Sequence, residues 1–137
     1  MFVPAFLPLY RAGVLKRPAA DGALLHAGFF IGTSELYDEL RRMPERERAL
    51  FRMSPISFVN TLLGDETGKR RDRRHARFVN NAMMATTLGA VVSDALEDGR
   101  AVSGVGGQYN FVAQAMALDD ARVVMALPAT REHAGDV

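Results

Sequence analysis

The chain has 137 residues, of which 48% are hydrophobic and 24% charged, and a formal net charge of +1. This balance is typical of a globular protein, and a net charge near zero gives no overall field that favours nucleic acid or an anionic membrane. The absence of cysteine excludes disulfides, thiolate metal ligands and cysteine nucleophiles, and no apolar run reaches the ~18–20 residues that span a bilayer. We therefore expect a soluble cytoplasmic protein whose residues 1–137 belong to a single domain.

The beginning of the chain predicts a helix followed by a strand. Apolar spacing indicates a short helix over residues 5–12, with Phe6, Leu9 and Tyr10 on one side. After a Pro- and Gly-containing turn, residues 23–31 form an almost continuous apolar run. Such a run without polar alternation predicts a strand covered on both faces.

Three helical segments are expected next. Thr33 or Ser34 can cap a helix that ends before Pro44. Residues 45–53 predict one or two further helical turns. The Ser54-Pro55 pair is typical of a helix start, and the apolar residues of segment 56–63 continue at helical spacing.

Residues 64–75 are polar and charged and predict a connection without regular structure. Strands are expected at Phe78–Met84 and Ala90–Ser93, although a helix through Ala82–Leu88 is a competing interpretation. A turn follows at Leu96–Gly99. Later, the apolar run 121–127, closed by Pro128, predicts another buried strand.

Helices thus alternate with strands, which predicts an α/β fold with an open, mixed or largely parallel sheet flanked by helices. The glycine-rich stretch Ser103–Phe111 is the best candidate site in this fold. It follows the apolar pair Ala101-Val102, which we take as the end of a strand, and leads into a helix over Phe111–Leu118. A helix start after a glycine loop presents unpaired N–H groups that can hold an anion or a polarised carbonyl oxygen. The alternative is a turn that merely permits close packing.

Other polar groups have both an ordinary and a functional interpretation. The basic cluster Lys69–Arg77 is either a solvated loop or a contact to phosphate, from a nucleotide-containing cofactor or from nucleic acid. Nucleic acid is the weaker of these two ligands, because no aromatic residue lies within the cluster. Asn80 and Asn81 fall in a predicted buried strand, where an amide needs a partner, so one of them either faces solvent or lines the site.

No metal site is predicted, because His26, His75 and His133 lack metal-ligand spacing. The acidic residues Asp94, Glu97 and Asp98 are typical of a solvated turn. No Ser-His-Asp order or paired carboxylate is evident, so the residues alone indicate a site without a nucleophile.

Several motifs resemble the C-terminal domain of the acetyl-CoA hydrolase/transferase family, which includes acetate and 4-hydroxybutyrate CoA-transferases. The family pattern Ser-Gly-x-Gly-Gly-Gln-x-Asp-Phe matches Ser103–Phe111, except that Asn110 replaces the aspartate. Further matches are Glu35–Asp38, Val79–Met83, Gly89 and Ala121–Thr130. The resemblance covers nearly the whole chain.

The resemblance implies chemistry on a CoA thioester of a small carboxylic acid such as acetate. A glutamate attacks the thioester, giving a mixed anhydride and then a glutamyl-CoA thioester, and the acyl group or CoA passes to a carboxylate or to water. By this match Gly106 and Gly107 would donate to the carbonyl oxygen, Asn80 would orient it, and Gly104 and Gln108 would complete the site. Coenzyme A is the implied cofactor, bound as substrate, and no metal is implied.

Two departures from the family limit what the resemblance implies. Met84 and Thr86 replace acidic residues that the family often carries, which leaves the acyl group and its acceptor open. The catalytic glutamate would fall at or before Met1. None of the chain's own glutamates is in a matching place: Glu35, Glu39, Glu45, Glu47, Glu66, Glu97 and Glu132.

We therefore expect an incomplete CoA-transferase-like domain whose Met1 is internal to a longer enzyme. Its N-terminal CoA-transferase domain would be a missing partner, and a homo-oligomer is compatible with the family. The chain alone should be inactive. The alternative is a non-catalytic remnant, or a partner subunit that binds CoA or protein without chemistry.

Overall fold

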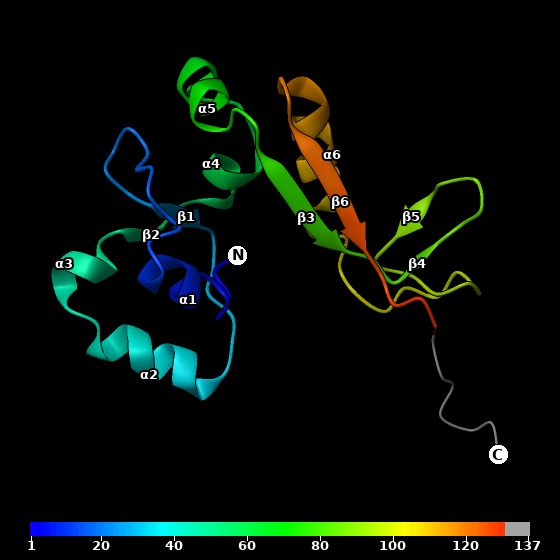
Figure 1. Ribbon diagram of the computed structural model, residues 1–137. Coiled ribbons are helices and arrows are strands. Elements are labelled where there is room, and N and C mark those ends of the chain that lie inside the picture. Colours follow the sequence, from blue (N-terminus) through cyan, green and yellow to red (C-terminus); the bar gives the residue numbers. More distant parts are fainter. Residues whose placement is uncertain (131–137) are drawn as a thin grey trace. The chain divides into compact units, whose positions relative to one another are not determined.

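The computed structural model describes residues 1–130, and the chain divides into two compact units, Met1–Asp72 and Arg73–Val137 (Figure 1). The first unit contains several helices and a parallel pair of strands, and the described part of the second contains one helix and another parallel pair, so the α/β class is confirmed. The strands form separate two-stranded sheets instead of one continuous sheet. Within residues 1–130, no helix has both the length and the apolar character that crossing a membrane requires.

The first unit is built around a short parallel strand pair. Leu25, His26 and Ala27 of β1 pair with Phe51, Arg52 and Met53 of β2. The chain passes from β1 to β2 through two helices, as a parallel connection requires. The elements of this unit are α1 (Phe6–Arg11), β1 (Leu25–Ala27), α2 (Ser34–Arg42), α3 (Glu45–Arg48), β2 (Phe51–Met53), α4 (Ile56–Asn60) and α5 (Glu66–Asp72).

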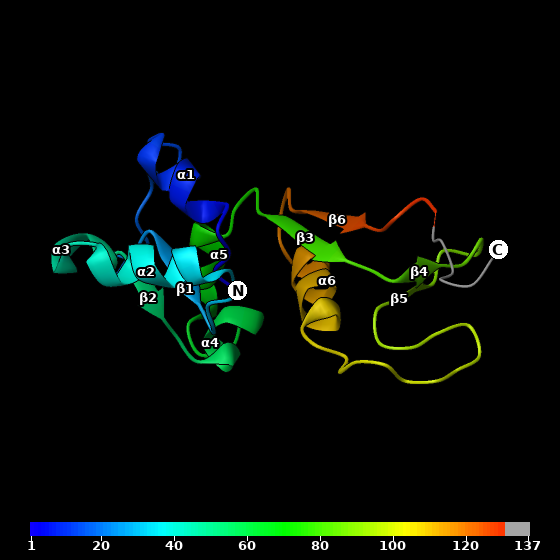
Figure 2. The same ribbon diagram turned by 90° about the horizontal axis from the view of Figure 1, so that it is seen from below.

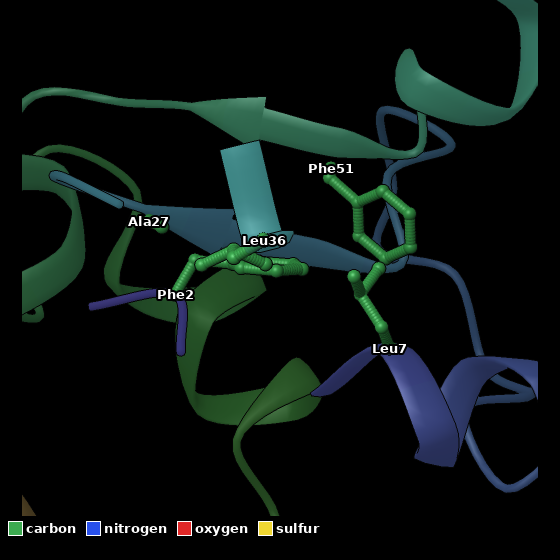
Figure 3. Packing of buried hydrophobic residues seen from close by; sticks show 5 residues of the cluster. All are labelled: Phe2, Leu7, Ala27, Leu36 and Phe51. Carbon is green, nitrogen blue, oxygen red and sulfur yellow. The ribbon is translucent and has the colours of Figure 1, made fainter. Parts of the chain in front are cut away.

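Phe2 lies at the centre of the core of this unit and is 0% exposed. Its ring stacks on Phe30 at 4.8 Å between centroids and meets the edge of Phe51 at 5.1 Å. Figure 3 shows how side chains from several elements converge there; the labelled members are Phe2, Leu7, Ala27, Leu36 and Phe51. Aromatic pairs of this geometry add to the burial of apolar area, so the first unit has a real hydrophobic centre.

The second unit combines a parallel pair with an antiparallel hairpin. Its elements are β3 (Arg77–Asn81), β4 (Met84–Ala85), β5 (Val91–Val92), α6 (Gln108–Ala117) and β6 (Arg122–Ala126). The strands β3 and β6 are parallel, with Val79 opposite Val124 and Asn80 opposite Met125. Figure 2 shows α6 along one side of this pair, and Phe78 of β3 meets Phe111 of α6 at 5.8 Å.

Burial alternates along β3 and β6, with one residue exposed and the next partly buried. Val79 is 65% exposed and Val124 is 48% exposed, while Phe78 and Val123 lie on the partly buried face. The prediction that segment 121–127 is a strand is confirmed as β6, but the prediction that this strand is buried is wrong, because alternate side chains along it are exposed.

Several predicted boundaries in the first unit are wrong. The run 23–31 forms a strand only over Leu25–Ala27, since Gly28 brings the chain close to α4: a Cβ there would lie 2.1 Å from Ile56 Cδ1. In α1 the buried residue is Leu7, whereas Leu9 is exposed. Segment 45–53 ends as the strand β2 because its last residues pair with β1.

The polar connection 64–75 also differs from the prediction, because it contains the helix α5. The contacts of Lys69 explain how the charged helix α5 can pack against the rest of the first unit. The residue is only 6% exposed, and its Nζ donates to the carbonyl oxygens of Thr61 at 3.1 Å and Leu63 at 2.6 Å and lies 4.7 Å from the ring centroid of Phe58. The ammonium group is therefore satisfied by backbone and ring contacts.

In the second unit the single strand predicted over Phe78–Met84 is wrong, because the segment is divided into β3 and β4 with residues 82–83 outside both. The strand predicted over Ala90–Ser93 is present only as β5, and the competing helix through Ala82–Leu88 is wrong. Residues 86–89 form the turn of the β4–β5 hairpin, with Gly89 at φ +89°. Ala101-Val102 forms no named strand; only Ala101 makes an isolated bridge, to Ala95. The helix after the glycine loop begins at Gln108, three residues before the prediction.

Candidate glycine-loop site

The glycine loop leads directly into α6, with Gly107 at its N-cap. Gly106 has φ +63°, a conformation that a residue with a Cβ adopts only at a cost, and open space surrounds the Cβ positions of Gly104 and Gly106. Within residues 1–130, the N–H groups of Gly104, Gly106 and Gly107 donate no hydrogen bond to protein atoms. These three exposed or half-exposed amides are therefore free to meet a ligand oxygen.

The start of the loop is fastened to the end of the β4–β5 hairpin. The carbonyl oxygen of Asp94 accepts hydrogen bonds from the N–H groups of Val102 at 2.8 Å and Ser103 at 3.3 Å. Ser103 Oγ donates to the carbonyl oxygen of Gly104 at 2.9 Å. The loop thus has a fixed entry although its tip makes few contacts.

Gln108 fastens the other end of the loop to the same hairpin. Its Nε2 donates to the carbonyl oxygen of Val91 at 3.3 Å, and its Oε1 accepts from Ser93 Oγ. Ser93 Oγ also lies 3.2 Å from the carbonyl oxygen of Asn81, at the end of β3. The side-chain amide of Gln108 is therefore engaged in holding the loop, and this arrangement favours a positioning role over direct ligand contact.

A cavity of about 480 Å³ lies beside the loop, between the hairpin, the first turns of α6 and β6. Most of its wall is apolar, and Asp94 is the only charged residue among the described residues that line it. The lining residues are Gly89, Val91, Val92, Ser93, Asp94, Val105, Gln108, Tyr109, Val112, Val123 and Met125. From the loop itself, ahead of α6, only Val105 is among these lining residues, so Gly104, Gly106 and Gly107 are neighbours of the cavity wall in the sequence and are not part of it. An apolar space next to backbone donors suits a carbonyl group carrying a small apolar substituent.

Asn80 lies on the face of β3 that also carries Phe78, opposite Met125, a residue of the cavity wall. Asn80 itself does not line the cavity. Its Nδ2 is buried and has no hydrogen-bond partner among the described residues, so its amide has unused donor capacity beneath α6. Asn81 is exposed.

A second cavity of about 590 Å³ is lined by β4, by residues 127–130 and by Glu97, Asp98 and Arg100. The predicted turn at Leu96–Gly99 is present, with a hydrogen bond from Leu96 N–H to Arg100 O at 3.0 Å. Glu97 is a residue of this cavity, and no glutamate lines the cavity beside the glycine loop among the described residues.

The basic cluster Lys69–Arg77 is largely engaged with protein groups. Lys69 is buried as described above, and Arg70 pairs with Glu66 at 2.7 Å. Arg77 donates to the carbonyl oxygen of Asp120 at 2.9 Å, and Arg73 donates to Gln114 Oε1. These contacts disfavour a phosphate-binding surface made by the whole cluster.

His26 and His75 each lie beside a polar side chain. His26 Nδ1 lies 2.8 Å from Ser54 Oγ, and His75 Nδ1 lies 3.5 Å from Asp120 Oδ2. His133 lies outside the described residues. Among the residues that the structure describes, no group of three or more histidine, aspartate or glutamate side chains could hold a metal ion.

Sequence reasoning missed Ser93 and the carbonyl of Asp94 as parts of this site, and it gave no role to Tyr109 within the predicted stretch Ser103–Phe111. Tyr109 lies on the cavity wall and is 76% exposed, directly after Gln108. Ser93 is adjacent to β5 in the sequence, but a serine at the end of a strand does not by itself indicate a role in a site. Its bond to Gln108 depends on a contact between the hairpin and α6 that no local pattern specifies.

Comparison with known proteins gives one family match. Residues 32–137 match the model described as acetyl-CoA hydrolase/transferase C-terminal domain. The matched region includes the glycine loop, the cavity walls and both parallel strands of the second unit. No curated protein matches the chain.

Proposed function

The chain belongs to the acetyl-CoA hydrolase/transferase C-terminal domain family, and from that premise we propose that it provides the thioester-binding part of an enzyme that acts on CoA esters of small carboxylic acids. The free amides of the glycine loop beside an apolar cavity are the observation that carries this proposal. We also propose a cytoplasmic location, supported by the absence of cysteine.

Gly106 and Gly107 are the proposed donors to the thioester carbonyl oxygen, with Gly104 close by in the same loop. As negative charge develops on that oxygen, fixed N–H dipoles stabilise it, and the loss of one such donor costs about 3–4 kcal/mol in comparable sites. Anchoring of the loop by Asp94 and Gln108 supports this role, because donors held in place need little reorganisation during the reaction. Asn80 would serve as an orienting amide behind the loop.

The proposed acyl group is small and apolar. The cavity wall carries valines and a methionine, and its one charged residue is Asp94. A substrate with a second carboxylate would meet an apolar wall and a like charge, both of which disfavour it. Acetyl and short-chain acyl groups therefore fit better than dicarboxylic ones.

The nucleophile of the proposed reaction is a glutamate carboxylate supplied from outside the glycine-loop cavity. Its oxygen would bond to the thioester carbonyl carbon as the CoA thiolate leaves, giving a mixed anhydride. The thiolate would then attack the glutamyl carbonyl and release the acyl carboxylate. We propose that this chain alone does not complete the cycle, since no described glutamate lines the cavity.

Amide NMR on the intact chain tests the loop directly. Titration with acetyl-CoA should shift the resonances of Gly104, Gly106 and Gly107 before those of Gly13 or Gly22, which lie in the other unit. Gly107→Pro removes one donor and requires φ to move from −97° to about −65°, and Gly107→Ala keeps the N–H as the matched control. We expect proline alone to weaken binding by roughly 2- to 10-fold, equivalent to one hydrogen bond of about 0.5–1.5 kcal/mol.

Uniform small shifts, or equal binding by the two Gly107 variants, would count against the loop as the donor site. A parallel assay with acetyl-CoA and acetate or succinate should give no exchange by the chain alone. Turnover that Gly107→Pro abolishes would show that the nucleophile lies within the chain. Co-purification with a polypeptide that carries the glutamate would favour the partner-subunit alternative.

A further inference from the structure

We propose that Ser54, His26 and Asp21 form a second, independent reactive site, in which Ser54 Oγ is a nucleophile toward activated acyl esters. The three side chains form one hydrogen-bonded chain in the first unit: Ser54 Oγ lies 2.8 Å from His26 Nδ1, and His26 Nε2 lies 3.2 Å from Asp21 Oδ1. Nothing in this proposal depends on the glycine loop or on CoA.

The carboxylate of Asp21 determines which ring nitrogen of His26 carries the proton. An ionised carboxylate only accepts hydrogen bonds, so Asp21 requires the proton of neutral His26 to be on Nε2. The lone pair of Nδ1 then faces Ser54 Oγ and can accept the hydroxyl proton. The roles of acid, base and nucleophile are those of the triads that recur on unrelated folds, but the two ring nitrogens are exchanged: in the serine protease triad Nε2 faces the serine and Nδ1 faces the carboxylate.

Asp21 is itself held in place by several donors. Its Oδ1 accepts from the N–H of Ala23 at 3.1 Å, and its Oδ2 accepts from Arg52 at 2.6 Å. Burial opposes ionisation of this carboxyl, but the Ala23 amide, His26 and Arg52 outweigh it and hold the pKa of Asp21 below its ordinary value of 3.8. The group is therefore ionised near neutral pH, as the orienting role requires.

Ser54 lies between a strand and a helix, where its hydroxyl can be accessible to a substrate. It follows the last residue of β2 and precedes Pro55 and α4, and its N–H donates to the carbonyl oxygen of Ala27 at 2.9 Å. A serine on a tight strand-to-helix turn exposes its Oγ at the end of a sheet. The side chain is half-buried, so it has access to solvent.

The base is shielded on one side by α4. The ring of Phe58 lies 4.9 Å from that of His26, and α4 packs closely against β1 (Figure 1). The imidazole is only 16% exposed. Reduced access to water favours proton transfer between the serine and the imidazole over exchange with solvent.

In the proposed reaction an activated acyl ester first acylates Ser54. Ser54 Oγ bonds to the acyl carbon while its proton moves to His26 Nδ1, and the bond from the acyl carbon to the leaving oxygen breaks. The same proton passes from Nδ1 to the departing alkoxide. Water then repeats the sequence in place of serine, releasing the acid and restoring Ser54.

A fluorophosphonate probe tests the proposal on the full chain. Intact-mass and peptide mapping should place a single adduct on Ser54 in the folded protein and none after unfolding in urea. Ser57→Ala, three residues further along in α4, is the matched control and should label like the unaltered chain. Ser54→Ala should abolish the adduct.

His26→Asn distinguishes a base from a structural link, because asparagine can still make hydrogen bonds but cannot take the proton. We expect the labelling rate and the hydrolysis of 4-nitrophenyl acetate to fall by about 100-fold, the effect of losing a general base. Asp21→Asn should lower both rates as well. An adduct on another residue, no adduct, or labelling of Ser54 that His26→Asn leaves unchanged would overturn the proposal.

Discussion

Both units contain a parallel strand pair, with several short helices in the first unit and α6 in the described part of the second, but the side chains that they bury differ in size. In the first unit Phe2, Leu7, Leu36 and Phe51 form a core of large side chains. In the second unit the most buried apolar residues are Ala82, Ala115 and Leu118, and one face of the β3–β6 pair is exposed. The first unit therefore has a stabilising centre of its own.

This difference in buried side chains indicates that the first unit contributes more stability and that the second unit carries the candidate site. Large buried side chains contribute most of the stabilising energy of a small domain, whereas small residues allow close approach of backbone and ligand. The second unit carries the glycine loop with its free amides and the adjoining cavity. We infer that the second unit is the less stable of the two.

The largest expected effect comes from Phe2→Ala. Removal of a fully buried phenylalanine costs about 3–5 kcal/mol, so the first unit should lose most of its stability. Urea titration followed by NMR should show early unfolding of residues before Asp72, with the β3 and β6 signals less affected. Phe29→Ala, at an exposed position, is the control. Equal loss in both units would mean that they unfold together.

Lys69→Met should have the next largest effect. It removes two hydrogen bonds to the carbonyl oxygens of Thr61 and Leu63 and the contact with the Phe58 ring. We expect the free energy of unfolding of the first unit to fall by about 1–2 kcal/mol. Arg70→Met, on the exposed side of the same helix, should cost less than about 0.5 kcal/mol. Similar values for both variants would contradict the structural role of Lys69.

Gly106→Ala tests the backbone of the second unit. At φ +63° an added Cβ costs about 1–2 kcal/mol, although the space around it is open. Gly104→Ala lies in the same loop without a positive φ and should be close to neutral. Thermal unfolding monitored on signals from β3 and β6 measures both, and an unchanged Gly106→Ala variant would show that the loop rearranges freely.

Val124→Thr should have the smallest effect, less than about 0.5 kcal/mol, because its side chain lies on the exposed face of β6. Val123→Thr places the same hydroxyl on the face toward α6 and should cost about 1–3 kcal/mol. The comparison is made by urea unfolding of the two variants side by side. A large cost for Val124→Thr would mean that the open face is covered in solution.

Much of the fold could be predicted because its signals are local. Pro44 and helical spacing located α2, and apolar runs located β3 and β6. Thr33 stands at the N-cap of α2 as predicted, but its side chain makes no capping hydrogen bond. The failures have a common cause. Residues 51–53 form a strand because β1 lies beside them, and residues 66–72 form a helix partly because Lys69 finds carbonyl partners six and eight residues away. Neither contact has a sequence signature.

The glycine loop was evident from the order of its residues, and the family match to residues 32–137 agrees with the resemblance it suggested. The sequence by itself determined the α/β class, the family and the position of the loop, because glycine spacing and hydrophobic periodicity act within a few residues. Tertiary structure alone decided that Gln108 binds the hairpin, that Lys69 is buried, and that Asp21, His26 and Ser54 meet. Each of these depends on parallel pairing or helix packing between distant segments, and such pairing is set by the whole fold.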